Sequence, residues 1–339
     1  MSALPEGTAP LDESEALAAF GAILDGEVPD EDIARFLVAL TERRETASEI
    51  AGAAQAMRAR MIRVAAPAGA IDVCGTGGDG HHTLNVSTAV ALVVAAAGVP
   101  VAKHGNRAAS SKAGAADTLE ALGLNLDRAA ETSEATLADL GICFLFAAKH
   151  HPAMAPIMPI RKAIGRRTIF NLIGPLANPA GVSRQLLGIA RPDHVPIYAE
   201  ALARLGTEGA MVVSGDEGLD ELSLAGGNVV ARVAGGSVTL GRVEPDAAGL
   251  PRAPVTAIRG GDAAHNAGAL RALLQGEPGA YRDAVIFNAA AALIVAEAAS
   301  DWRAAAEEAA QIIDRGLANT LLDCWIATVG SSARGLRQA

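Results

Sequence analysis

The stretch 71-IDVCGTGGDGHHTLNVST-88 decides the fold that we expect for this chain. Its apolar beginning, Ile71 to Cys74, is typical of a short buried strand, and Gly75, Gly77 and Gly80 then follow the G-x-G-x-x-G spacing of a phosphate-binding turn. A strand, a glycine turn and a helix in succession form the opening unit of a parallel α/β sheet. The spacing alone leaves two ligand classes open, a dinucleotide such as NAD and some other phosphate compound.

Beyond Ala70, short apolar strands alternate with alanine-rich helices. This alternation predicts an α/β fold with a mostly parallel sheet that binds ligands at the carboxyl ends of its strands. The stretch 243–254 is rich in Pro, Gly and acid, so we expect a surface loop there. The expected elements are strands at 71–74, 99–102, 142–146, 186–189 and 210–213, a hairpin of 229–233 and 237–240, and helices at 86–97, 112–122, about 263–275 and about 279–299, with two more helices at the end.

The chain before this alternation has a different pattern. Residues 12–65 carry apolar residues at helical spacing, and Thr46 with Glu49 forms the sequence signature of a capping box. We therefore expect this segment to be purely helical, with most of its apolar stripes buried between helices. Part of that apolar surface is a candidate for contact between two subunits.

Composition narrows the classes of partner. The net charge of −10 repels nucleic acid and anionic membranes, and only 3% of the residues are aromatic, too few for base-stacking platforms. Neither a signal peptide nor an apolar run of membrane-spanning length is recognisable. Cys74, Cys143 and Cys324 lie far apart, which argues against zinc and disulfides. We expect a cytoplasmic protein with no nucleic-acid or membrane partner.

A second loop decides between the two ligand classes. An NAD-binding unit needs an acidic residue about 20 positions beyond the glycine turn. That place is occupied by 103-KHGNRAASSK-112, which is basic and rich in hydroxyl groups, and we expect it to be a loop. The glycine turn itself continues through Thr83 to Asn85, which we expect to cap the following helix. Two such loops on neighbouring strands predict a ligand with two phosphate groups.

An acidic stretch, 214-SGDEGLDELS-223, follows another expected strand. Asp220 and Glu221 are adjacent there, and one or two carboxylates together with the ligand's phosphates are the usual ligands of Mg²⁺. An isolated acidic pair is more often a solvated turn. Beside two phosphate loops, the magnesium hypothesis is favoured.

Longer blocks of the chain resemble the signatures of the anthranilate phosphoribosyltransferases. The blocks run in order through GTGGDG, NVST, KHGNRAASSKAGAAD, HHPAM, PIRKAIGRRTIFNLIGPLANPAG and GLDELS to the closing GGD, NAGALRALLQGE, YRDAVIFNAAAAL and DRG. The resemblance implies a small all-helical domain plus a larger α/β domain of the nucleoside phosphorylase and phosphoribosyltransferase class. It places the helical domain at 1–66, with a contribution from about 165–185, and the α/β domain at 67–339. It also implies a homodimer through the helical domain.

The same resemblance implies a reaction, its cofactor and its site. Phosphoribose passes from 5-phosphoribosyl 1-diphosphate to the amine of anthranilate, in a step of tryptophan biosynthesis that Mg²⁺ assists. Ser87, Asp220 and Glu221 would hold Mg²⁺, and Gly75, Asn106 and Arg161 would hold anthranilate. The residues implied for the sugar diphosphate are Gly75, Gly78, Asp79, Thr83, Asn85, Val86, Ser87, Thr88, Lys103, His104, Gly105, Asn106, Arg107, Ala108, Ala109, Ser110, Ser111 and Ala115.

No catalytic acid or base is assigned. An aromatic amine is neutral at pH 7, and Arg161 suits the anthranilate carboxylate because its planar fork gives two parallel hydrogen bonds. His104, His150 and His151 are the candidates for proton transfer, although a supporting hydrogen bond is the more frequent role. Cys74 is expected to be a packed strand residue. The departures from the family pattern are Ala148, Lys149, which is near the expected anthranilate entrance, the pair His81 and His82, and His265, which we expect at the surface.

Two other functions stay open on the sequence alone. A pyrimidine nucleoside phosphorylase shares the fold, but its glycine motif differs from the one found here. A non-catalytic nucleic-acid-binding relative needs a basic surface, which the charge of this chain does not provide.

Overall fold

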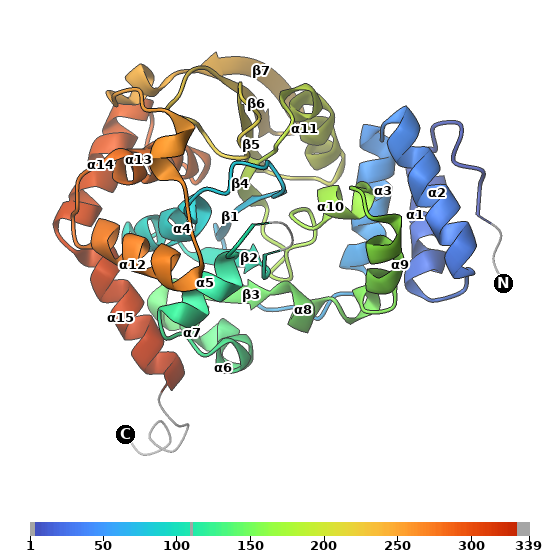
Figure 1. Ribbon diagram of the computed structural model, residues 1–339, viewed down its shortest axis with the longest axis horizontal. Coiled ribbons are helices and arrows are strands. Elements are labelled where there is room, and N and C mark those ends of the chain that lie inside the picture. The colour runs from blue at the N-terminus through green and yellow to red at the C-terminus, as the bar shows by residue number, and fades with distance from the viewer. Residues whose placement is uncertain (1–3, 109–110, 331–339) are drawn as a thin grey trace.

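The computed structural model describes residues 4–108 and 111–330 of the chain. It has an α/β body that surrounds one sheet and an all-helical end that carries the N-terminus (Figure 1). Ala109 and Ser110, two of the predicted site residues, lie outside the described residues.

Within the described residues the body contains one seven-stranded sheet of order β3-β2-β1-β4-β5-β6-β7. Five strands are parallel, and the hairpin β6–β7 adds to β5 in antiparallel fashion. The prediction of a mostly parallel sheet with one terminal hairpin is confirmed. The strands are β1 Ile71–Gly75, β2 Val101–Gly105, β3 Ile142–Phe146, β4 Arg184–Gly188, β5 Gly209–Gly215, β6 Asn228–Ala234 and β7 Ser237–Val243.

The strand order reverses between β1 and β4. The chain proceeds from β1 outward through β2 to β3 and then returns to β4 on the other side of β1. Loops that leave the carboxyl ends of two such strands diverge and open a crevice, where ligands of open α/β sheets bind. Gly75 and Gly188, paired in register, lie at this point of the sheet.

Helices cover both faces of the sheet (Figure 1). One face shares a hydrophobic core with α4, α13, α14 and α15, and α13 is buried almost along its whole length because it is apolar on all sides. The other face packs against α11 and the helical end, so sheet and helical end share a second core. The covering helices are α4 Val86–Ala96, α11 Val195–Arg204, α12 Ala263–Leu274, α13 Ala280–Val295, α14 Trp302–Asp314 and α15 Leu317–Gly330.

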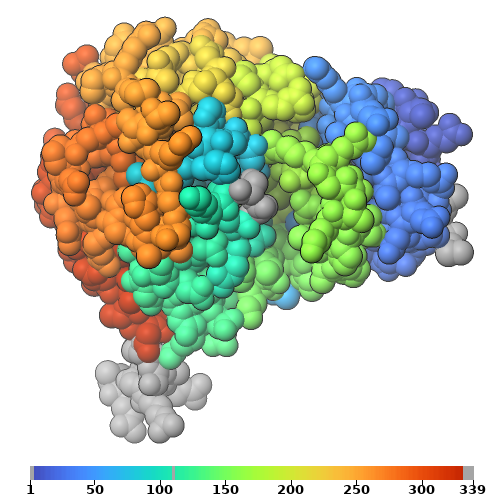
Figure 2. Space-filling model, in the orientation of Figure 1, coloured from blue at the N-terminus to red at the C-terminus, as the bar shows by residue number. Residues whose placement is uncertain are grey.

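The helical end combines α1 Glu13–Leu24, α2 Asp30–Arg43 and α3 Ala47–Arg58 with two helices from later in the chain. α9 Ile157–Ile164 packs on α2, and α10 Ile169–Ile173 packs on α2 and α3. In the space-filling view this green segment lies between the blue helices and the body (Figure 2). The capping box of Thr46 and Glu49 is confirmed. Residues 59–65 are not helical, contrary to the prediction of a helical segment from 12 to 65.

Short elements complete the body. They are α5 Ala115–Ala121, α6 Leu126–Glu131, α7 Ser133–Leu140, α8 Ala147–His150, and 3₁₀ turns at Pro152–Met154, Pro192–His194, Pro245–Ala248 and Val255–Ile258. The expected loop at 243–254 therefore contains one short 3₁₀ turn. The expected helix at 112–122 begins only at Ala115, after Gly114, whose N–H is bonded to Asp117. Within the described ranges, no helix has the length and apolar character needed to cross a bilayer.

Candidate active site

An acidic loop, residues 216–227, connects β5 to β6 and crosses the ends of β1 and β4. Its Asp220 approaches two glycines so closely that no side chain fits at either position. A β-carbon on Gly75 would lie 2.5 Å from Asp220 Oδ2, and one on Gly188 would overlap the carbonyl oxygen of Asp220. Glycine is required here by close approach of backbones. The two strand ends thereby bring Asp220 to the point where the strand order reverses.

The glycine turn, residues 76–80, follows β1 directly. Gly77, Gly78 and Gly80 have φ of 68°, 70° and 80°, a left-handed conformation that favours glycine. The Gly77 N–H donates a hydrogen bond to Asp220 Oδ2 at 2.6 Å. The hydroxyl oxygen of Thr76 is buried and has no partner in the described structure. A backbone N–H group suited to an anion is thus already bonded to a carboxylate of the acidic loop.

The N-terminus of α4 shows the same arrangement. The Ser87 N–H donates to Glu221 Oε1 at 3.2 Å. Asn85 occupies the cap position, but the prediction that its side chain caps the helix was wrong, because its Oδ1 accepts from Thr118 at 2.6 Å and from Asn266 at 2.9 Å. The buried Thr88 hydroxyl has no partner in the described structure. A glutamate from a distant loop therefore occupies the anion-binding end of this helix.

Lys103 lies beneath both acidic contacts. The prediction that Lys103 and His104 lie in a loop was wrong: both belong to β2 and are buried, because polar partners inside the sheet accept their donors. Lys103 Nζ donates to the Val73 carbonyl at 2.8 Å and to Ser87 Oγ at 3.3 Å. Burial lowers the pKa of Lys103, and the charge of Asp72 opposes that shift. The ammonium group thus faces the N-terminus of α4.

The acidic pair is electrostatically crowded. Burial, followed by repulsion from Asp79, raises the pKa of Asp220 to about 7. Burial, followed by repulsion from Asp220, raises the pKa of Glu221 to about 8, and Lys103 opposes the shift. In the part of the chain that the structure describes, no three His, Cys, Asp or Glu side chains form a metal site by themselves. Two crowded carboxylates beside the Ser87 hydroxyl do fit Mg²⁺, provided that phosphate oxygens supply the other ligands.

The loop that follows β2 folds back on α5. Arg107, one of the predicted phosphate ligands, pairs with Asp117 at 2.8 Å and Glu120 at 2.9 Å, and these ion pairs raise its pKa. Its guanidinium is therefore already engaged away from the glycine turn.

The remaining predicted residues lie around the turn and this loop. Asn106 is exposed, the Ala108 N–H donates to Asp117, and the Ser111 hydroxyl donates to the Ala113 carbonyl. Gly105 ends β2 against Phe144 and Ala115, Thr83 pairs with Arg259, and Val86 is buried.

Arg161 lies on α9, in the helical end. It is half-buried, its guanidinium carbon lies 5.9 Å from the centre of the Phe170 ring, and its Nη1 contacts Met158 Sδ at 3.7 Å. Burial lowers the pKa of Arg161. The ion pairs of the described residues do not include this arginine. A half-buried guanidinium without a carboxylate is a suitable site for a ligand carboxylate.

Of the candidate histidines, His104 follows Lys103 directly in β2, so its side chain points to the other face of the sheet. His104 Nε2 and His151 Nε2 are 3.2 Å apart and share one hydrogen bond. Burial and neighbouring histidines lower the pKa of His104 to about 3 and that of His151 to about 4, so both are neutral at pH 7. His150 Nδ1 is bonded to the Ile62 carbonyl. These contacts are of the supporting kind expected for them.

The other residues that the sequence singled out are buried, ion-paired or exposed at the surface. Cys74 is buried, and burial raises the pKa of its thiol well above the ordinary value, as a packed strand residue requires. Lys149 pairs with Asp127 at 2.8 Å, and His265 is exposed as expected. Thr76 and Arg167 lie at the glycine turn, although no role was predicted for either from the sequence. Both stand inside quoted motifs, GTGGDG and GRRT, which was the available signal.

Comparisons with known proteins agree with this geometry. Residues 68–319 match the model of the glycosyl transferase family, a/b domain, and residues 3–61 match that of the helical bundle domain of the same family. The anthranilate phosphoribosyltransferase of Novosphingobium aromaticivorans is 75% identical over 97% of this chain and 100% of its own length. That of Erythrobacter litoralis is 67% identical over 96% of this chain and 99% of its own length.

Solved structures agree with both results. The crystal structure of anthranilate phosphoribosyltransferase from Thermus thermophilus has a TM-score of 0.90 at 42% identity, over 98% of this chain and 100% of that one. The Saccharomyces cerevisiae enzyme in complex with PRPP and Mg has a TM-score of 0.85 at 29% identity, over 97% of this chain and 94% of that one. The chain therefore belongs to the glycosyl transferase family and, within it, to the anthranilate phosphoribosyltransferases.

Proposed function

We propose that this chain transfers the phosphoribosyl group of 5-phosphoribosyl 1-diphosphate to the amine of anthranilate. The amine nitrogen forms a bond to C1 of the ribose while the bond from C1 to the diphosphate oxygen breaks. Pyrophosphate leaves with the bonding electrons, and the amine loses a proton, giving N-(5-phosphoribosyl)anthranilate. The observation that carries the proposal is the convergence of the glycine turn, the α4 N-terminus, Lys103 and the acidic pair on one edge of the sheet.

The donor substrate is assigned to that edge. The N–H groups of Gly77 and Ser87, and the partnerless hydroxyls of Thr76 and Thr88, are donors for phosphate oxygens. Lys103 adds a positive charge below them. Charge that develops on the departing diphosphate is stabilised best by donors that are already oriented.

Asp220, Glu221 and Ser87 are the residues that we assign to Mg²⁺. When bound, the ion supplies positive charge that neutralises the diphosphate leaving group. The fit rests on the two carboxylates themselves, since burial raises the pKa of both, repulsion from Asp79 adds to the rise at Asp220 and repulsion from Asp220 adds to it at Glu221, and a cation relieves such repulsion. Both carboxylates must give up the N–H groups of Gly77 and Ser87 before phosphate oxygens can take those donors.

The acceptor is assigned to the side of the crevice that faces the helical end. Arg161 is proposed to hold the anthranilate carboxylate, with Asn106 and Gly75 nearer to the reacting amine. A carboxylate fixed by a planar guanidinium also fixes the direction of the neighbouring amine, and orientation of this kind lowers the barrier for transfer. The chain's own contribution to the step is thus alignment and charge stabilisation, without an assigned acid or base.

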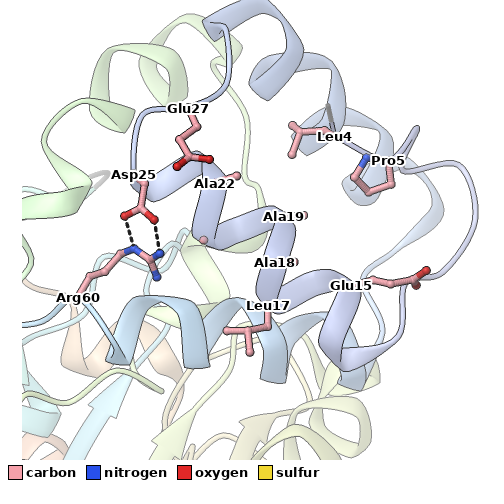
Figure 3. A pocket seen from close by; sticks show the side chains of 11 residues that line it. Leu4, Pro5, Glu15, Leu17, Ala18, Ala19, Ala22, Asp25, Glu27 and Arg60 are labelled. Atoms are coloured by element: carbon pink, nitrogen blue, oxygen red, sulfur yellow. Dashed lines mark hydrogen bonds and ion pairs between the residues drawn. The ribbon is translucent and has the colours of Figure 1, made fainter. Parts of the chain in front are cut away.

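We also infer a cytoplasmic homodimer that forms through the helical end, with domains at 1–66 plus about 165–185 and at 67–339. A hollow of about 730 Å³ runs along α1, where small side chains such as Ala18 and Ala22 leave room and Leu17 is 37% exposed (Figure 3). Arg60 and Asp25, joined as an ion pair, form one wall. An apolar hollow with a charged wall is suited to helices of a second copy.

Loss of anthranilate fluorescence tests the proposed function. We expect the fluorescence of anthranilate to fall when protein, 5-phosphoribosyl 1-diphosphate and Mg²⁺ are mixed, and to stay constant when any one of them is omitted. Pyrophosphate release in equal amount checks the stoichiometry. Phosphorolysis of thymidine or uridine without anthranilate transfer would identify a nucleoside phosphorylase instead, and salt-sensitive DNA binding would identify a nucleic-acid-binding protein.

A further inference from the structure

Arg167 reaches from the helical end to the glycine turn. It stands between α9 and α10, and its Nη2 donates to the Gly77 carbonyl at 2.6 Å, 90 positions away in the chain. Its guanidinium also covers Gly78, where an added β-carbon would lie 3.4 Å from Cζ. The side chain is partly buried. A cation of the helical end thus contacts the turn whose N–H groups are the expected phosphate donors.

The guanidinium keeps donors for a ligand. One of its five N–H groups is bonded to Gly77, and the ion pairs of the described residues include no partner for Arg167. Its neighbour Arg166 differs, because it is exposed and pairs with Glu42 of α2 at 2.9 Å. Two adjacent arginines therefore point to different places. One faces the helical end, and the other faces the crevice.

The excess of negative charge at the crevice favours a cation at the position of Arg167. Asp79, Asp220 and Glu221 bring three carboxylates to the place where an anionic ligand is expected, and Lys103 opposes them from inside the sheet. Burial and Asp79 raise the pKa of Asp220, and the positive charge of Arg167 opposes that rise. A planar guanidinium matches two oxygens of a diphosphate better than an ammonium group does.

We propose that Arg167 binds the diphosphate of the donor substrate and thereby joins the helical end to the glycine turn. This inference rests on the proposed function, whose own site residues do not include Arg167. The short segment from α9 to α10 then gives one cation to each substrate: Arg161 to the acceptor carboxylate and Arg167 to the donor diphosphate. The two arginines are expected to affect different Michaelis constants.

Calorimetric titration with pyrophosphate in the presence of Mg²⁺ tests this assignment. Arg167→Gln is expected to bind pyrophosphate about tenfold or more weakly than the wild type, because a hydrogen-bonded charge pair is lost. Arg166→Gln is the matched control and is expected to bind as the wild type does. Arg167→Lys keeps the charge but loses the fork, so we expect an intermediate affinity.

Steady-state kinetics separate binding from a merely structural role. In Arg167→Gln the KM for 5-phosphoribosyl 1-diphosphate is expected to rise, while the KM for anthranilate stays within about twofold of the wild-type value. A twofold change is smaller than the change in affinity that the loss of one hydrogen-bonded charge pair causes. Equal pyrophosphate affinity in Arg167→Gln and Arg166→Gln would overturn the inference. Equal rises in both KM values would also overturn it, since a distorted crevice weakens both substrates. Failure of the wild type to bind pyrophosphate would overturn the proposed function and this inference together.

Discussion

The two sides of the crevice differ in how their charges are partnered. At the sheet edge, carboxylates of the acidic loop occupy the N–H groups of Gly77 and Ser87, and Lys103 is bonded to Val73 and Ser87. On the helical side, the Arg161 guanidinium contacts the Met158 sulfur and the Phe170 ring and has no carboxylate partner among the described residues. Under the proposed function, a donor substrate must exchange existing contacts, whereas an acceptor adds a contact to a cation without a carboxylate partner. The two sides are therefore expected to respond differently to substitution.

The largest effect is expected from the acidic pair. Asp220→Asn with Glu221→Gln removes both negative charges but keeps the shape of the side chains, so the fold is expected to persist. We expect Mg²⁺-dependent turnover to fall by about 100-fold or more, the range seen when a charge-stabilising group is removed from an active site. The fluorescence assay measures the rate, and circular dichroism checks the fold. Wild-type turnover in the folded double variant would contradict this prediction, because the acidic pair at the sheet edge would then not be needed for the reaction.

The helical side is tested by Arg161→Ala. We expect the KM for anthranilate to rise by about 10- to 100-fold, the value of a hydrogen-bonded charge pair, while the KM for the sugar diphosphate stays nearly constant. Initial rates over a grid of both substrates give both constants. Arg166→Ala serves as the control, because its partner is Glu42. A rise confined to the KM of the sugar diphosphate would assign Arg161 to the other side.

Gly188→Ala tests whether the acidic loop is held by close packing. The added methyl group would overlap the carbonyl oxygen of Asp220, so the loop has to move. We expect a loss of about 1–3 kcal/mol in the free energy of unfolding, as for other overpacked sites, together with weaker Mg²⁺-dependent activity. Gly226→Ala is the control within the same loop, because an added β-carbon meets no atom within 4 Å there. Equal stability of the two variants would contradict the packing seen at Gly188.

The last test concerns the pH dependence of stability. The pKa of Asp220 rises from 3.8 to about 7, and that of Glu221 from 4.5 to about 8. A raised carboxyl pKa means that the folded state binds protons which the unfolded state has already lost. The stability that this proton binding gives to the folded state is present below about pH 4 and is lost as the pH rises toward 8.

Denaturant titrations of the metal-free protein measure this effect. Asp220→Asn with Glu221→Gln cannot lose protons, so the double variant is expected to gain stability relative to the wild type between about pH 4 and about pH 8, the two ends of that window. The difference between variant and wild type isolates the pair from the buried histidines, whose lowered pKa acts in the opposite direction. A constant difference across the range would show that the two carboxylates are not perturbed.

Much of the fold was predictable because its signals are local. The alternation of apolar strands and helices, the glycine turn and the capping box at Thr46 each depend on a few neighbouring residues. The extent of β2 was not predictable, because Lys103 and His104 lie in a strand only where Val73, Ser87 and Asp72 supply partners from other segments. A polar strand end therefore reads as a loop until its neighbours are known.

Which segments meet at the candidate site was predictable to a similar degree. Ordered motifs indicated which segments meet, and the acidic pair does lie beside the glycine turn and α4. The sequence did not predict that Glu221 rather than Asn85 satisfies the α4 N-terminus, that Arg107 is engaged by α5, or that Arg167 crosses from the helical end. Each of these contacts joins residues far apart in the chain or depends on competition between partners.

A crystal structure of this protein with Mg²⁺ and 5-phosphoribosyl 1-diphosphate bound tests the central claim most directly. We expect the N–H groups of Gly77 and Ser87 to donate to phosphate oxygens, with Asp220 and Glu221 turned away from them toward the ion. The contrary result is a bound sugar diphosphate while both carboxylates keep their bonds to Gly77 and Ser87. That result would place the donor substrate away from the glycine turn.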